Sequence, residues 1–249
     1  RTYDYDPAQK KWRQTATIAA TGEVSAERPA DQLQPYHFYL KCTRYLTCIL
    51  QPRDKSLVNS LPMISGTAEG EVAGVELTIQ DLAPETYWDG HAFAEPPAWL
   101  RADGAAKWRY TSVPRWSSGA SYRIMARAVL PDGSSGVPDC SVTFRYDDDP
   151  PAAWVAPPRT ADACGPLTEL SGTAFDRDSE LTAVEVAAQR QADGRWWSGS
   201  QWVSSAAWLN AQGAAQWRFA GLAPAAFSDF QGSYRFLARA RDRADNVGV

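Results

Sequence analysis

An internal repeat constrains the fold of this chain more than any other feature of its sequence. Residues 65–68 and 171–174 both read Ser-Gly-Thr-Ala, and the Gly-Ala-Ala-Lys-Trp-Arg-Tyr of residues 104–110 recurs as Gly-Ala-Ala-Gln-Trp-Arg-Phe at 213–219. Further matches, in the same order along the chain, pair Val75 with Val184, Trp88 with Trp197, Trp99 with Trp208 and Tyr122 with Tyr234. Ordered matches of this kind indicate two homologous units of about 100 residues, the usual size of a β-sandwich.

The repeat also predicts where the units begin and end. Residues 147–151 read Asp-Asp-Asp-Pro-Pro, and two prolines end a strand because they cannot donate ladder hydrogen bonds. We therefore expect an N-terminal β segment at residues 1–47, which matches neither repeat and is interpreted as the end of a preceding domain, then a first domain at 48–149 and a second at 150–249. The strand at 141–146 has no counterpart in the second copy, so we expect the second domain to lack its last strand and to have an open edge.

Short runs rich in Val, Thr and aromatic residues, separated by clusters of Gly, Pro, Asp and Ser, are typical of strands joined by turns. In the first copy they predict strands at 48–50, 61–68, 74–79, 86–93, 98–100, 107–112, 122–130 and 141–146. Before the repeats, the pattern predicts a hairpin within residues 2–18 and a strand at 36–40. The expected fold is all-β, with tandem antiparallel β-sandwiches.

Charge and motifs exclude several classes of function. Lys and Arg number 25 against 29 Asp and Glu, so no basic footprint for nucleic acid exists. No run of about 18 apolar residues could span a bilayer. The histidines are only two, and the sequence has no GxSxG elbow, no HExxH and no phosphate-cradling glycine loop. We therefore expect a protein that is not an enzyme.

The two copies resemble the bacterial immunoglobulin-like, or fibronectin-III-like, repeats found in tandem in large secreted and cell-surface proteins. The Ser-Gly-Thr-Ala strand, the Val-Glu-Val strand, the Trp-x-Gly hairpin, the Trp-Arg-aromatic strand and the ending at 234–248 carry this resemblance. It covers roughly residues 48–249. It implies immunoglobulin-like sandwiches, a bacterial extracellular or cell-surface location, spacer, stalk or adhesion roles, and in some members calcium at domain junctions.

Acidic residues gather at one predicted end of the second domain. The linker entering a sandwich, the loop after its second strand and the loop before its last strand share one end. Calcium takes six to eight oxygen ligands, so a junction calcium site is a hypothesis and no other cofactor is expected. The alternative is a solvated junction in which Arg177, Arg241 and Arg243 are the counter-charges. The candidate calcium ligands are Asp147, Asp149, Asp176, Asp178, Asp242 and Asp245.

Tryptophans number 11, and those that recur between the copies indicate a shared packing role. Trp12, Trp116, Trp154, Trp196 and Trp202 do not recur, and the first choices among them for a ligand site are Trp116, Trp196 and Trp202. Exposed, they could stack on sugar rings and form a carbohydrate-binding site. The alternative is packing beneath long loops, because large aromatic side chains are mostly buried.

The four cysteines depart from the pattern of the resembled repeats. They have no histidine partners at metal-ligand spacing, and an even number in a strand-rich chain indicates disulfides. Cys48–Cys140 is one pairing, since the first and last strands of a sandwich lie near each other. Cys42–Cys48 is the competing one.

These observations predict a non-catalytic module that spaces, displays or assembles at the bacterial cell surface. Its partners would be other domains of the same protein or neighbouring surface proteins, contacted through edge strands, with glycans as a further ligand class. One alternative is a carbohydrate-binding accessory module of a secreted enzyme. Another is an accessory subunit of a larger membrane or filament assembly, joined by edge-strand contacts.

Overall fold

The computed structural model describes residues 2–6, 11–16, 46–156, 167–227 and 232–249. Strands make up its regular structure apart from one turn of 3-10 helix, η1 (Pro224–Phe227), so the all-β prediction is confirmed. No described helix is long and apolar enough to cross a membrane. The predicted hairpin is present as β1 (Thr2–Asp6) and β2 (Lys11–Ala16), which pair antiparallel. The strand predicted at 36–40 lies outside the described residues.

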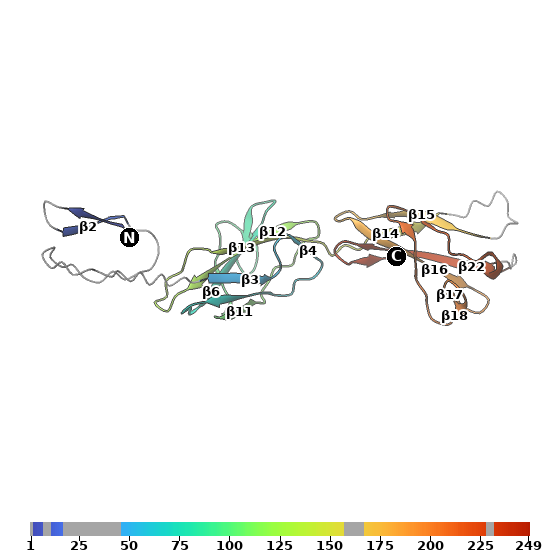
Figure 1. Ribbon diagram of the computed structural model, residues 1–249, viewed down its shortest axis with the longest axis horizontal. Coiled ribbons are helices and arrows are strands. Elements are labelled where there is room, and N and C mark those ends of the chain that lie inside the picture. The colour runs from blue at the N-terminus through green and yellow to red at the C-terminus, as the bar shows by residue number, and fades with distance from the viewer. Residues whose placement is uncertain (1, 7–10, 17–45, 157–166, 228–231) are drawn as a thin grey trace.

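The first sandwich packs two sheets face to face (Figure 1). One sheet has the order β10-β11-β5-β3, and the other has the order β4-β13-β12-β6-β7-β8 with β9 beside β6. All pairs are antiparallel except β4 with β13. The strands are β3 (Leu46–Gln51), β4 (Ser56–Val58), β5 (Ile64–Glu69), β6 (Gly74–Asp81), β7 (Thr86–Trp88), β8 (Phe93–Ala94), β9 (Leu100–Arg101), β10 (Asp103–Gly104), β11 (Lys107–Tyr110), β12 (Ser121–Val129) and β13 (Cys140–Tyr146).

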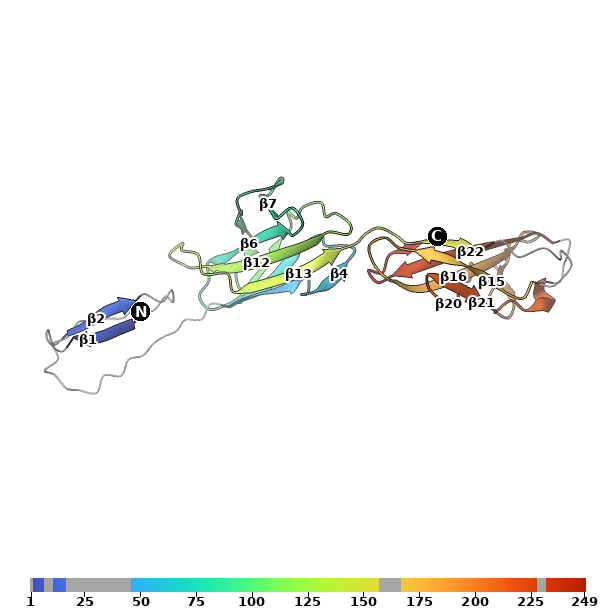
Figure 2. The ribbon, with the colours of Figure 1, turned by 90° about the horizontal axis from the view of Figure 1, so that it is seen from above.

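The second sandwich repeats this strand order except for β4 and β13, which have no counterpart among its described strands, and it follows the first end to end along the long axis of the molecule (Figure 2). Its sheets are β14-β15-β21-β20 and β18-β17-β16-β22-β23, with β19 beside β16. The strands are β14 (Ala152–Val155), β15 (Leu170–Phe175), β16 (Leu181–Arg190), β17 (Trp196–Trp197), β18 (Trp202–Val203), β19 (Leu209–Asn210), β20 (Gln212–Gly213), β21 (Gln216–Phe219), β22 (Tyr234–Asp242) and β23 (Val247–Gly248).

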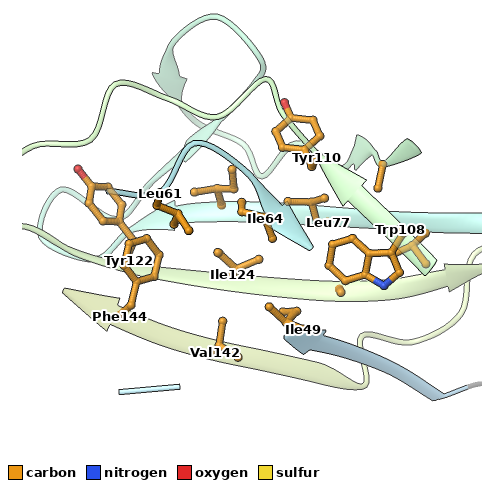
Figure 3. Close-up of a cluster of buried hydrophobic side chains, with 14 of the residues drawn as sticks. Ile49, Leu61, Ile64, Leu77, Trp108, Tyr110, Tyr122, Ile124, Val142 and Phe144 are labelled. Atoms are coloured by element: carbon orange, nitrogen blue, oxygen red, sulfur yellow. The ribbon is translucent and has the colours of Figure 1, made fainter. Parts of the chain in front are cut away.

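The core of the first sandwich lies between its sheets and is built by alternation (Figure 3). On β12, Tyr122, Ile124 and Ala126 are buried while Arg123 points to solvent, as the period of two predicts. Phe144 of β13 stacks on Tyr122 with ring centroids 5.5 Å apart. Burying a large apolar side chain contributes roughly 1.5–3 kcal/mol, so these alternating strands hold the two sheets together.

The two best-matched motifs recur together because they pack on each other. Gly66 of β5 lies under the indole ring of Trp108, and a Cβ at Gly66 would overlap that ring and the backbone oxygen of Cys48. Gly172 has the same relationship to Trp217 in the second sandwich. Both tryptophans are buried. The glycine is therefore required by close approach of a ring, and any larger residue would separate the strands.

Two features of the first sandwich differ from the sequence prediction. The strand predicted at 86–93 is split into β7 and β8, because the Asp89 carboxylate accepts the backbone N–H groups of His91 and Ala92, both at 2.7 Å, and closes a turn. These bonds also lower the pKa of Asp89. The short strand β4, three residues long, was not predicted and pairs parallel with β13.

One side of β22 has little strand pairing in the described part of the chain. In the first sandwich β13 pairs with β12 from Ser121 to Ala126, whereas β23 pairs with β22 only at Ala240 and Arg241. Tyr234 and Phe236 of β22 are half-buried, while their counterparts in β12 are buried. This edge therefore has few ladder pairs and lies beside partly exposed aromatic rings, with β14 close to it.

Candidate metal centre

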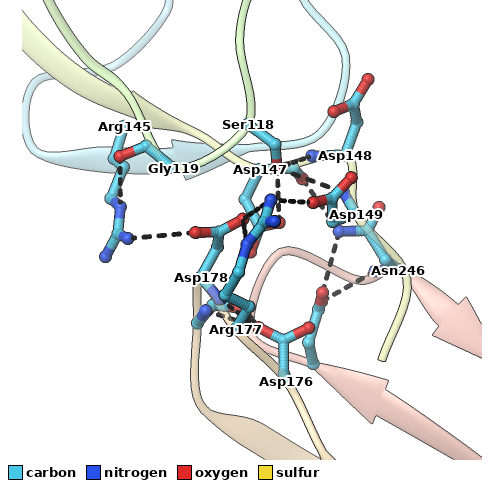
Figure 4. Close-up of polar contacts among 12 residues, drawn as sticks. Ser118, Gly119, Arg145, Asp147, Asp148, Asp149, Asp176, Arg177, Asp178 and Asn246 are labelled. Carbon is cyan, nitrogen blue, oxygen red and sulfur yellow. Dashed lines mark hydrogen bonds and ion pairs between the residues drawn. The ribbon is translucent and has the colours of Figure 1, made fainter. Parts of the chain in front are cut away.

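The linker between the sandwiches is fixed to the first one by its own backbone. Asp147 donates its N–H to the carbonyl oxygen of Val58 at 2.9 Å. Asp148 and Asp149 donate theirs to Ser118 Oγ at 3.1 and 3.3 Å. The linker backbone therefore follows a defined course beside the end of the second sandwich, with Asp147 and Asp149 near Asp178 and Arg177 (Figure 4).

Three carboxylates from three separate segments converge at this junction. Asp147 belongs to the linker, Asp176 directly follows β15, and Asp242 is the last residue of β22. One oxygen of each lies within 4.8 Å of the others. Asp147 and Asp242 are 0% and 1% exposed, and Asp176 is half-buried. Carboxylates this close repel one another unless one is protonated or a cation bridges them.

Asp147 contributes an oxygen that has no hydrogen-bond partner. Its Oδ1 accepts the Ser118 hydroxyl at 3.2 Å, but Oδ2 is buried without a partner. Burial raises the pKa of Asp147, and the charges of Asp176 and Asp242 raise it further, against the opposing hydroxyls of Ser179 and Ser118. An unpartnered buried polar atom is costly and requires an explanation, of which an ion is one.

No described lysine or arginine forms an ion pair with these three carboxylates. Asp176 is held instead by backbone donors, since its Oδ1 accepts the N–H of Asp178 at 2.9 Å and of Ser179 at 2.5 Å. These bonds fix the carboxylate without neutralising it. The centre thus carries negative charge that no cationic side chain balances directly.

Asn246 connects the centre to the linker and was not among the residues predicted for it. Its backbone N–H and its side-chain Nδ2 each donate to Asp242, at 2.8 Å, and Nδ2 also donates to the backbone oxygen of Asp147 at 2.8 Å. The signal in the sequence was the Asp-Asn pair at 245–246, close behind the end of β22. Ser118, whose hydroxyl holds the linker, was missed as well.

The other three predicted calcium ligands are engaged by arginines. Asp149 pairs with Arg177. Asp178 lies 3.2 Å from Arg177 and 3.8 Å from Arg145. Asp245 is 82% exposed and lies 3.6 Å from Arg241. The structure therefore brings Asp147, Asp176 and Asp242 together and places Asp149, Asp178 and Asp245 in ion pairs around them.

A glycine of the first sandwich lets the two sandwiches approach closely. Gly119 has a φ of 79°, and a Cβ there would lie 2.5 Å from Asp178 Oδ1. Arg145 reaches across the same contact, donating to the Gly119 carbonyl oxygen at 3.2 Å and pairing with Asp178. The junction is therefore a packed contact as well as a tether.

The residues predicted for carbohydrate binding do not form a common platform. Trp116 is only 9% exposed, its Nε1–H donates to the Leu61 carbonyl oxygen at 2.9 Å, and its ring packs edge-on against Tyr122. The segment between β11 and β12 carries Trp116 into the core, which favours the packing alternative for this residue. Trp196, of β17, is half-buried.

Trp202 is also half-buried and belongs to an aromatic cluster of the second sandwich. Its ring lies 5.5 Å from that of Trp197 and 6.0 Å from that of Tyr234. The Arg190 guanidinium lies 4.6 Å from its centroid. These neighbours restrict access to the ring, which favours a packing role.

A different pair of aromatic residues is exposed. Trp154 of β14 is 56% exposed and Phe175 of β15 is 61% exposed. Trp154 pairs with Thr173, and Ala152 pairs with Phe175, so Trp154 and Phe175 lie diagonally on the same outer face of the sheet. Trp154 is one of the non-recurring tryptophans that the sequence offered for sugar stacking, whereas Phe175 was not predicted.

A tryptophan–arginine–glutamate stack recurs in both sandwiches. Arg127 lies 3.9 Å from the centroid of Trp99 and 2.8 Å from Glu76. In the second sandwich the same positions are filled by Trp208, Arg239 and Glu185, at 4.3 and 2.7 Å. The packing role predicted for these recurring tryptophans thus takes the form of a surface cation–π stack.

The predicted Cys48–Cys140 disulfide is not formed in the structure, where both residues are free thiols. Ile49 nevertheless donates its N–H to Cys140 Sγ at 3.1 Å, which places the two strands side by side. Cys42, the partner in the competing pairing, lies outside the described residues.

Comparison with known proteins gives structural neighbours only. No protein-family model and no curated protein sequence matches this chain. Among solved structures, the fibronectin(III)-like modules of Clostridium thermocellum CbhA align with 82% of this chain and 90% of theirs, at 14% identity and a TM-score of 0.35. A Ca2+-stabilized adhesin from an Antarctic bacterium that binds ice aligns with 77% of this chain and 43% of its own, at 16% identity and a TM-score of 0.37.

A third neighbour is the BSP domain of a biofilm-associated protein, with 80% of this chain and 28% of that chain aligned, 12% identity and a TM-score of 0.22. Alignments with TM-scores this low carry no argument about the fold, which follows from the strand order of the sheets. The strand order defines two paired β-sandwiches, and the carboxylates of Asp147, Asp176 and Asp242 form an acidic centre at their junction.

Proposed function

We propose that this chain is a non-catalytic structural and adhesion module of a bacterial cell surface, and that calcium bound at its junction fixes the orientation of its two sandwiches. The sequence resemblance to secreted and surface repeats supports the location. The end-to-end arrangement supports a spacing role, because it extends the two sandwiches along one axis (Figure 2).

One observation carries the calcium part of the proposal. Asp147 Oδ2 is buried and unpartnered within a cluster of three carboxylates that no described cationic side chain neutralises. A bound cation would supply the missing partner and would remove the repulsion. Asp147, Asp176 and Asp242 would hold it.

The chemistry of the donors favours calcium among the common cations. The cluster consists of carboxylates, without histidine or cysteine, so zinc is disfavoured. Calcium accepts oxygen ligands in irregular arrangements and completes its shell with water or carbonyl oxygens, whereas magnesium demands near-octahedral geometry. Extracellular calcium modules often bind in the range of about 10⁻⁴–10⁻³ M, which suits a partly open site.

The positions of the three ligands give the ion its mechanical role. Asp147 is fixed to the first sandwich through Val58 and Ser118, while Asp176 and Asp242 belong to the second. An ion shared among them would join the two sandwiches directly. Without it, the like charges would push the linker away from the second sandwich and permit bending.

Calcium titration calorimetry on matched variants tests the assignment. Asp242→Asn should weaken binding at least tenfold, because it removes a charged ligand that is 1% exposed. Asp245→Asn, three residues further on and paired only with Arg241 at 3.6 Å, is the control and should bind as the unmodified protein does. Equal affinity for all three proteins, or no binding to any, would refute the site.

A carbohydrate-binding function is the second candidate, and the exposed Trp154–Phe175 face favours it. Thr173 and Gln216 lie beside these rings on the paired strands β15 and β21, so apolar rings and hydrogen-bonding groups share one flat surface. Sedimentation with insoluble polysaccharides should then fall several-fold in Trp154→Ala. Absence of binding by the unmodified protein removes this candidate and leaves the first intact.

A further inference from the structure

The two cysteines in the described part of the chain, Cys48 and Cys140, lie where β3 passes beside the start of β13. β3 is the edge strand of one sheet, and β13 belongs to the other. Ile49 donates its N–H to Cys140 Sγ at 3.1 Å. Thr47, two residues before Ile49, donates its N–H to Oδ2 of Asp139, the residue directly before β13, at 2.7 Å. These two bonds set the register that places Cys48 beside Cys140.

The surroundings of the two thiols differ. Cys48 is exposed, whereas Cys140 is partly buried. Burial raises the pKa of the Cys140 thiol, and contact with the Cys48 thiol and the charge of Asp139 raise it further, against the hydrogen bond from Ile49. The exposed thiol is therefore the one an external reagent meets first.

We propose that Cys48 and Cys140 form an oxidative modification site, and that their disulfide is a covalent clamp between the first and last long strands of the first sandwich. This goes beyond the proposed junction function and does not depend on calcium. The clamp crosses from one sheet to the other, so it closes the edge of the sandwich at the end away from the acidic centre.

The reaction is a thiol–disulfide exchange with a disulfide oxidant, either a small-molecule disulfide or a protein disulfide oxidase. The Cys48 thiolate attacks one sulfur of the oxidant, and a thiolate leaves, giving a mixed disulfide. Cys140 then loses its proton and displaces the second sulfur from Cys48. The two cysteines lose two electrons and two protons in all, and the oxidant is reduced to two thiols.

The second sandwich shows that this pair is a special feature of the first. Cys48 stands opposite Thr67 in β3 and β5, and Trp154 stands opposite Thr173 in β14 and β15. The position equivalent to Cys48 is therefore a tryptophan. The clamp would act on one sandwich only, which provides an internal reference for measurements on both.

The clamp has a mechanical consequence that can be measured. A bond from Cys48 to Cys140 encloses nearly all of the first sandwich in a covalent loop. When the chain is pulled from its ends, that loop cannot extend, so the unfolding length of this sandwich should shrink by about 300 Å. The second sandwich should unfold over its usual length.

Peptide mapping without reduction tests the proposal on the full chain, equilibrated in oxidised and reduced glutathione. A dominant Cys48–Cys140 cross-linked peptide, with a melting temperature raised by about 10 °C or more, supports it. Dominant cross-links from Cys42 or Cys164, or persistent free thiols at 48 and 140, overturn it.

Variants separate the clamp from effects on folding. The double variant Cys48→Ser, Cys140→Ser should melt as the reduced unmodified protein does, and it should no longer respond to oxidant. Single-molecule pulling should show the shortened unfolding step only in the oxidised unmodified chain. A shortened step in the double variant, or a full-length step in the oxidised protein, contradicts the proposal.

Discussion

Asn246 Nδ2 donates a hydrogen bond to the backbone oxygen of Asp147 at 2.8 Å, across 99 residues of sequence. The same amide donates to Asp242 Oδ2, also at 2.8 Å. One side chain of the second sandwich thus holds both the linker that leaves the first sandwich and a carboxylate of the acidic centre. The centre and the relative position of the sandwiches are consequently coupled through this residue.

Asn246→Ala should therefore weaken two properties together. Losing hydrogen bonds to partly buried partners costs about 1–3 kcal/mol of unfolding free energy, and calcium affinity should fall because Asp242 loses its positioning donor. Denaturant unfolding and calorimetry measure the two effects. Asn210→Ala, at an exposed residue of β19, is the control and should change neither. A normal calcium affinity in Asn246→Ala would remove Asn246 from the site.

The raised pKa of Asp147 predicts an unusual pH dependence for the calcium-free protein. Well below the pKa that the Asp147 carboxyl has in the unfolded chain, this carboxyl is protonated in both the folded and the unfolded state. It then makes no contribution to the free energy of unfolding. As the pH rises from about 4 towards 7, the unfolded chain releases the proton more readily than the folded one does, so this group lowers stability. Stability measured against Asp147→Asn should fall over that range. A constant difference between the two proteins would contradict the shift.

Gly119→Ala should disturb the contact between the sandwiches. The new Cβ would lie 2.5 Å from Asp178 Oδ1, in a residue with a φ of 79°. Gly133→Ala is a matched control, since its φ is 82° and nothing lies within 4 Å of the position of its Cβ. Both variants carry a backbone cost of about 1 kcal/mol. Only Gly119→Ala should also loosen the junction, seen as a lower calcium affinity.

Removal of the recurring surface stack should have a modest and local cost. Arg127→Ala loses the Trp99 face and the Glu76 ion pair, both partly exposed, and should destabilise the first sandwich by about 1 kcal/mol. A double-mutant cycle with Trp99→Ala measures the coupling between the two. Arg123→Ala, on the same strand, is the comparison. Additive effects of the Trp99 and Arg127 changes would show that the stack contributes nothing.

The sandwiches could be predicted from sequence because their main determinants are short motifs that recur in the same order in both copies. Gly66 and Trp108 lie far apart in the chain but form one contact, and the second copy reproduces it with Gly172 and Trp217. Alternation on β12 identified its buried face. Strand β4 escaped prediction because three residues carry too little pattern, and it is held by pairing with β13.

The acidic centre was predictable only in part. Topology alone places Asp147, Asp176 and Asp242 at one end of the second sandwich, as expected. Which acidic side chains face one another and which face arginines depends on rotamers and on the course of the loops. Sequence pattern does not determine these, nor the amide bridge of Asn246.

The tryptophans show the same limit. Trp116 is buried because a segment without regular structure turns into the core, and no periodicity reports such a turn. The outward orientation of Trp154, by contrast, follows from alternation, since Ala153 and Val155 on either side of it pack towards the core.

The distribution of distances between the two sandwiches tests the central claim most directly. Spin labels on exposed sites, Lys107 of β11 and Gln216 of β21, allow pulsed electron paramagnetic resonance with calcium and with chelator. The account predicts a narrow distribution in calcium that broadens in chelator, and a broad one in both conditions for Asp242→Asn. Identical distributions in calcium and chelator for the unmodified protein would contradict it.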